Sequence, residues 1–204
     1  MDHSIDRHRS IVTMHKLAAE EVAGLMEGFH SNLEDGLFEL AYRNSEPDHQ
    51  RFCFDLMREL RFRKPLLMAA FSRIMGETAD SWFAEPAGHT PFSLEPELVS
   101  LADTMAEKCM AHFSGLLRML SQRIAAVTGI NHPPESLPIG PVSLSRMFVA
   151  SCRESELEPS SIEVLRELFL RFVLDRMGSV YGRCNRELQL GRMESDIPVL
   201  RSSV

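Results

Sequence analysis

The sequence is poor in the features that mark several large classes of protein. Its 204 residues contain no run of about 18 apolar residues, the length that a membrane-spanning helix needs, so no membrane insertion is expected. The four cysteines are widely separated and form no Cys-x-x-Cys pair, which favours reduced thiols over a disulfide framework. Residues 1–10 are polar and contain no apolar core of a signal peptide. Together these absences predict a cytoplasmic protein.

Lysine is scarce as well. Of the 22 lysine and arginine residues, only Lys16, Lys64 and Lys108 are lysine. Arginine suits fixed, planar pairing with carboxylates, whereas lysine suits a solvated surface. The 29 acidic residues give a formal net charge of −7, which disfavours nucleic acid as a general partner. The composition therefore predicts organised ion pairs on an acidic protein, without a nucleic-acid partner.

The usual marks of catalysis are missing too. The 11 glycines are scattered and form no phosphate-binding loop, and neither a Gly-x-Ser-x-Gly motif nor a paired Cys–His signature occurs. Glu27 and His30 have the spacing of a helical di-metal site, but the other such pair, Glu46 and His49, straddles a helix start at Pro47. We therefore expect no catalytic residues, no cofactor and no metal site, and expect that the chain is not an enzyme.

What the sequence does have is helical periodicity throughout. Apolar residues recur at steps of three and four, and no segment alternates with the period of two that a half-buried strand shows. The pattern predicts an all-α fold, with bundle-like packing of about four long amphipathic helices plus one or more short helices. The expected helices cover about residues 10–44, 48–76, 96–128, 144–152 and 160–190, with loops at about 77–93 and 129–142.

Two residues are expected to interrupt these helices. Pro65 should kink the second helix, because proline lacks a backbone N–H and crowds the preceding turn. Gly178 should bend or break the last helix, because glycine is costly inside a helix. The expected domain organisation is a flexible polar N-terminus at 1–9 and a single helical domain at 10–204, with three long helices in 10–128 and the short and last helices in 143–190.

The second helix carries the strongest candidate for a binding surface. Six basic residues stand between Arg51 and Arg73, against only Asp55 and Glu59. This excess suits a phosphate group or an acidic partner; the alternative is that it pairs with the acidic first helix. The residues that we predict to bind a partner are Arg51, Phe54, Arg58, Arg61, Phe62 and Lys64.

Three residues of the second helix stand out by their position on the helical wheel. Arg63 falls inside the apolar stripe, between Leu56 and Leu67, which predicts a structural, buried ion pair. Phe54 and Phe62 fall instead on the charged face. For these rings we expect burial on two sides of a central helix, with an exposed docking patch as the alternative.

Several phrases, taken in order, carry a resemblance to a known family. They are Asp35–Ala41, Phe54–Arg61, Pro138–Pro141 ahead of Leu144 and Phe148, and the stretch from Phe172 through Tyr181 to Leu188. Over roughly residues 29–200 the chain resembles the N-terminal part of a bacterial family catalogued as domain of unknown function number 1631. Some relatives carry the label thymidine phosphorylase, but the sequence contains no glycine-rich loop to hold phosphate.

These observations favour a function in binding over one in catalysis. We expect a non-enzymatic helical protein-interaction or regulatory module of a bacterial cytoplasmic protein, with a protein partner and self-association into a homo-oligomer. One alternative is a binder of a phosphate-bearing ligand, such as cyclic di-GMP or RNA, through the Arg-rich second helix. Another alternative is a helical metal-dependent enzyme.

Overall fold

The computed structural model describes residues 2–43, 45–84 and 94–195, and within this part of the chain every regular element is a helix. The all-α prediction is confirmed. In chain order the elements are α1 (Asp2–Ser31), α2 (Leu33–Arg43), α3 (Pro47–Glu77), the 3-10 helix η1 (Thr78–Phe83), α4 (Pro96–His112), α5 (Ser114–Thr128), η2 (Pro134–Ser136), α6 (Pro141–Glu154), α7 (Pro159–Phe172), η3 (Leu174–Arg176) and α8 (Met177–Ser195).

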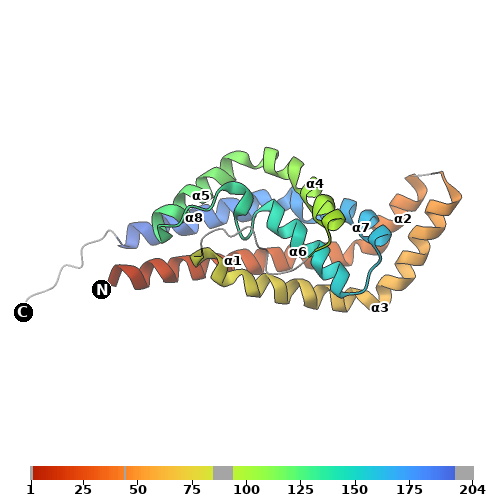
Figure 1. Ribbon diagram of the computed structural model, residues 1–204, viewed down its shortest axis with the longest axis horizontal. Helices are drawn as coiled ribbons and strands as arrows, with labels where there is room; N and C mark the ends of the chain where they lie inside the picture. Colours follow the sequence, from red (N-terminus) through yellow and green to blue (C-terminus); the bar gives the residue numbers. More distant parts are fainter. Residues whose placement is uncertain (1, 44, 85–93, 196–204) are drawn as a thin grey trace, which may run out of the picture.

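The helices pack around one elongated hydrophobic core. Figure 1 shows α1 and α8 side by side along the long axis, with α3 on one side of them and α4 and α5 on the other, while α6 crosses the middle of the molecule and contacts both α4 and α3. The buried hydrophobic residues form a single cluster, whose first member in the sequence is Ile11 on α1 and whose last is Leu188 on α8. At the far end from the start of α1, helix α2 and the first part of α3 pair with each other and project from the body (Figure 1).

The first and third predicted helices are each broken in two, which corrects their predicted continuity. The first begins at Asp2, so residues 2–9 are helical rather than a flexible end, and it is interrupted at Asn32. The Asn32 amide donates a hydrogen bond of 2.7 Å to the Gly28 carbonyl, as asparagine often does where it competes with the helix backbone. The third helix is interrupted at Phe113, where φ is −98° and ψ is 13°.

The last long helix breaks at Val173 and η3 rather than at Gly178, where the sequence predicted it. Gly178 lies in the first turn of α8, and a Cβ built there would come within 2.9 Å of Cε1 of the Phe113 ring. Glycine at this position therefore allows the close approach of α8 to the junction between α4 and α5.

Helix α3 changes direction part-way along its length (Figure 1), and Pro65 lies inside it. Proline removes one hydrogen bond of the helix and forces the preceding turn outward. The bend lets the second half of α3 follow α1 and α6 while the first half pairs with α2.

A buried polar cluster ties η1 to α1. The Trp82 indole N–H donates to Nδ1 of His15 at 3.0 Å, and Nε2 of His132 lies 3.2 Å from the Trp82 carbonyl oxygen. All three side chains are buried. Because Nδ1 of His15 accepts a hydrogen bond, the interaction requires that nitrogen to be unprotonated.

Gly178 and Gly182 of α8 give a matched test of packing. Gly182→Ala meets no atom within 4 Å, so it should stabilise the protein by up to about 1 kcal/mol through helix propensity. Gly178→Ala should instead destabilise it by about 1–3 kcal/mol, since its Cβ collides with Phe113. Urea unfolding of both variants measures the difference, and equal stabilisation by both would contradict the packing argument.

Stability should also depend on the protonation of His15. Burial lowers the pKa of His15 below its usual value of 6.5, against a smaller opposite effect of a hydrogen bond to the Met75 backbone. The unfolded chain therefore binds a proton at a higher pH than the folded one. The stabilisation is complete above pH 6.5 and is lost as the pH falls through the lower, folded-state pKa.

Unfolding in urea, followed by the fluorescence of the single tryptophan, should show this loss between pH 8 and pH 5. His15→Gln keeps an acceptor for the Trp82 indole but cannot titrate, so its free energy of unfolding should fall less over the same range. An identical fall in the wild type and the variant would show that His15 is not the group responsible.

Candidate functional site

The six residues predicted to bind a partner do not form one surface. The outward stripe of α3 holds Arg51, Arg58 and Phe62, all of them exposed. Phe54 lies at the contact with α2, where it is half-buried. Arg61 and Lys64 line a groove between α3 and the α1–α2 junction. The structure therefore separates an outer aromatic face from a groove.

The outer face combines rings from α2 and α3. Phe38 and Tyr42, one turn apart on α2, have ring centroids 4.6 Å apart, and each lies edge-on to Phe54 at 6.2 and 6.3 Å. Arg58 follows one turn after Phe54 on α3, and Phe62 follows one turn later still. We call these five residues, Phe38, Tyr42, Phe54, Arg58 and Phe62, the α2–α3 face.

The expectation of two-sided burial is wrong for Phe62, which is 83% exposed. The physical reason is that α2 covers only the Phe54 side of this half of α3, and no other described helix lies over its outward stripe.

Phe38 and Tyr42 of α2 were not among the residues predicted from the sequence. Each directly follows a buried residue of the same helix, Phe38 after Leu37 and Tyr42 after Ala41, a pattern that could have identified them as exposed aromatic residues.

The arginines of this region are mostly paired on their own helix. Arg51 lies 3.9 Å from Asp48, and Arg58 lies 3.1 Å from Asp55. Pairing with the acidic first helix occurs only for Arg61, whose guanidinium is 3.6 Å from Glu34 on α2. All these pairs are exposed, and exposed pairs contribute little to stability.

Arg63 occupies a different place, half-buried between α3 and the turn that joins α6 to α7. It pairs with Glu59 at 2.8 Å and with Glu156 at 2.9 Å, and it donates to the Ser155 carbonyl oxygen at 2.8 Å. The hydrogen bond that Arg63 donates to Glu156, and then the one that it donates to Glu59, raise the pKa of Arg63. Arg63 thus connects two segments that are distant in the sequence.

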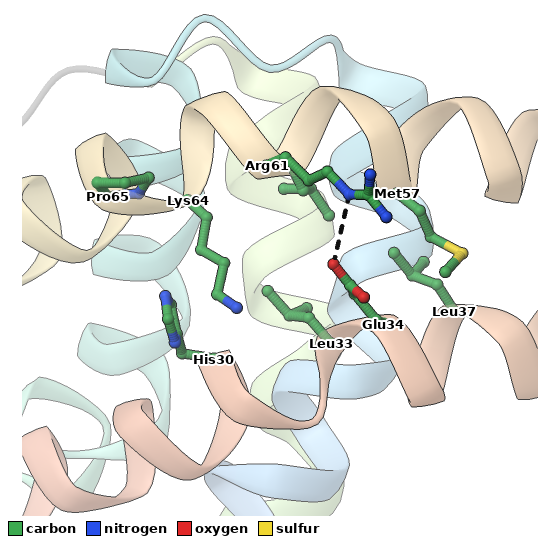
Figure 2. Close-up of a pocket in the computed structure, with 9 residues that line it drawn as sticks. His30, Leu33, Glu34, Leu37, Met57, Arg61, Lys64 and Pro65 are labelled. Carbon is green, nitrogen blue, oxygen red and sulfur yellow. Dashed lines mark ion pairs between the residues drawn. The ribbon is translucent and has the colours of Figure 1, made fainter.

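The groove has a volume of about 300 Å³. Its walls are mainly apolar, and Figure 2 shows Arg61 and Lys64 reaching across it from α3 toward Glu34 and His30. The lining residues are His30, Leu33, Glu34, Leu37, Met57, Leu60, Arg61, Lys64 and Pro65. Burial, and then the positive charge of Lys64, lowers the pKa of His30, while Glu27 opposes this effect. His30 is therefore neutral at pH 7.

Clusters of metal ligands and reactive thiols are two further kinds of functional group. No group of three or more His, Cys, Asp or Glu side chains in this part of the chain is placed to hold a metal ion. The four cysteines are free and buried, and burial raises the pKa of Cys184 to about 12. That thiol is protonated at neutral pH and is not a nucleophile in this state.

Residues 7–189 match the family model described as protein of unknown function (DUF1631), N-terminal domain. The chain belongs to this family. No curated protein matches it, and no solved structure does. Among the residues described, no helix of this DUF1631 N-terminal domain has the length and apolar character needed to cross a membrane.

The later phrases of the family resemblance have packing roles. The Tyr181 hydroxyl donates to the Ile139 carbonyl oxygen at 3.2 Å, and the Asn185 amide donates to the Leu116 carbonyl oxygen at 3.1 Å. Gly140 caps α6 within a tight turn, where a Cβ would lie 3.0 Å from the Leu137 carbonyl oxygen. These residues fix α5, α6 and α8 against each other.

Arg63 and Arg58 give a matched pair for testing which arginine holds the DUF1631 N-terminal domain together. Arg63→Met should lower the thermal midpoint, because it leaves the Ser155 carbonyl and two carboxylates without their donor. Arg58→Met removes only an exposed pair and should leave the midpoint unchanged. Melting followed by circular dichroism distinguishes them, and equal midpoints would show that Arg63 is dispensable.

Proposed function

We propose that this chain is a non-enzymatic protein-interaction or regulatory module, and that its partner docks on the α2–α3 face. The supporting observation is where apolar side chains meet solvent. Of the seven large hydrophobic residues exposed in the described part of the chain, four lie on α2 and α3: Phe38, Tyr42, Phe62 and Leu66. Contiguous exposed apolar surface marks interaction sites, and aromatic residues with arginine are enriched in their centres.

The face also indicates the chemistry of the partner. The three exposed rings of the face, Phe38, Tyr42 and Phe62, and the nearby exposed Leu66 on α3 suit an apolar ridge, such as one side of an amphipathic helix. Arg58 is 77% exposed in its pair with Asp55, so a carboxylate of the partner can compete for it at little cost. A partner helix with apolar residues flanked by acidic ones fits both conditions.

The phosphate-bearing ligand receives less support than a protein partner. Arg51 pairs with Asp48, and Arg58 pairs with Asp55. These two carboxylates neutralise the arginines that would bind a phosphate group, and they also repel the phosphate itself.

A cytoplasmic location is supported by the four free thiols, which a reducing compartment preserves.

Removing the exposed rings tests the proposal. The double variant Tyr42→Ser with Phe62→Ser should lose capture of the partner from extract of the source organism, by at least about tenfold, because hot-spot aromatics carry most of the binding energy. Its helical circular dichroism should be unchanged, since Phe62 is 83% exposed. Quantitative affinity capture followed by mass spectrometry gives the readout.

The matched control is Met119→Ser with Leu190→Ser, which removes exposed hydrophobic side chains from α5 and α8. It should capture the partner as well as the wild type does. Equal loss in both double variants would mean that capture is non-specific, and no loss in either would place the partner elsewhere. Light scattering of the same proteins shows whether the partner is a second copy, as the expected homo-oligomer requires.

A further inference from the structure

The groove between α3 and the α1–α2 junction is distinct from the α2–α3 face. Its floor and walls are formed by Leu33, Leu37, Met57, Leu60 and Pro65, so most of its surface is apolar. A volume of about 300 Å³ is at the lower end of the range for small-molecule sites. A small ligand with an apolar body fits these walls.

Lys64 is the unusual member of the groove. The other five basic residues of α3 each lie within 4 Å of a carboxylate: Arg51, Arg58, Arg61, Arg63 and Arg73. Lys64 has no such partner among the described residues, although it is half-buried. Lys64 lines the groove together with apolar side chains, and its ammonium group has no carboxylate within 4 Å among the described residues, so it is free to bind an anion that enters the groove.

A second donor stands beside it. Figure 2 shows the Lys64 side chain extending across the groove toward α1, where the His30 ring faces it. His30 is half-buried and neutral, so one ring nitrogen carries a hydrogen that it can donate. An anion between these two groups would accept a hydrogen bond from each.

The charges in the groove decide which anion fits. Arg61 and Glu34 cancel each other, and their pair spans the groove (Figure 2). Lys64 contributes one positive charge and neutral His30 contributes none. The lining residues alone carry a net charge of about +1, which matches a carboxylate, whereas a doubly charged phosphate would leave one negative charge uncompensated near Glu34 and within the field of Glu27.

We infer that the groove binds a small monocarboxylate with a short apolar tail. The carboxylate accepts hydrogen bonds from the Lys64 ammonium and the His30 ring. The tail lies along Leu33 and Leu60, beneath the Arg61–Glu34 pair. This site is independent of the protein partner proposed above, since Phe62 and the other exposed rings do not line it.

Titration with octanoate, monitored by amide chemical shifts of the isotope-labelled full chain, tests the inference. We expect saturable shifts on the segments that line the groove. Lys64→Met should weaken octanoate binding about tenfold or more, because it removes a charge-assisted hydrogen bond. Lys64→Arg should restore most of it. Lys16→Met, which removes an exposed lysine of α1 away from the groove, is the matched control and should bind as the wild type does.

Two further ligands separate the contributions of charge and tail. Octan-1-ol, which has the tail without the charge, should bind at least tenfold more weakly than octanoate. Octyl phosphate should also bind more weakly. Equal binding of the alcohol, tighter binding of the phosphate, or no saturable octanoate shift would each overturn the inference. The Tyr42→Ser and Phe62→Ser variant should bind octanoate normally, so failure of this site and failure of the protein-docking proposal remain distinguishable.

Discussion

The groove and the α2–α3 face both depend on the interruption of the first long helix at Asn32. The Asn32 side-chain amide donates a hydrogen bond to the Gly28 carbonyl oxygen. The backbone carbonyl oxygen of Asn32 accepts a hydrogen bond from the N–H of Gly36 in the first turn of α2. Helix α2 can then leave the axis of α1 and pair with α3. The break places His30 at the end of one helix and Leu33 and Glu34 at the start of the next, so a continuous helix would not form this groove.

Close approach between helices holds α2 in this direction. A Cβ on Gly36 would come within 2.8 Å of the Leu168 side chain, so glycine allows α2 to lie directly against α7. Glu39 reinforces the contact by accepting a hydrogen bond of 2.7 Å from Arg171, and this bond, with that from Arg43, lowers the pKa of Glu39. With its inner side packed in this way, α2 leaves Phe38 and Tyr42 on the outside.

Arg63, predicted to form a buried ion pair, is half-buried, because one of its partners is the exposed Glu156. The sequence predicted the helical class and the buried stripes, because both follow from periodicity along one helix. It could not predict the breaks at Asn32, Phe113 and Val173, where the apolar period continues in phase and no proline or glycine intervenes. At Asn32 the break is accompanied by the local hydrogen bond to Gly28, and at Phe113 by the close approach of α8 at Gly178, neither of which the apolar pattern reveals. For the same reason the helical wheel placed Phe62 on a second buried side: it shows which residues share a face but not whether another helix covers that face.

The residues that packing leaves unexplained are therefore the candidates for binding. Gly36, Gly178, Tyr181 and Asn185 all have a role in bringing helices together. Phe62 has no such role, since an aromatic ring that is 83% exposed gains little from folding. A half-buried lysine without a carboxylate partner likewise adds nothing to the stability of α3. Since neither side chain is required by the fold, each is better explained by a second molecule, one against the outer face and one inside the groove.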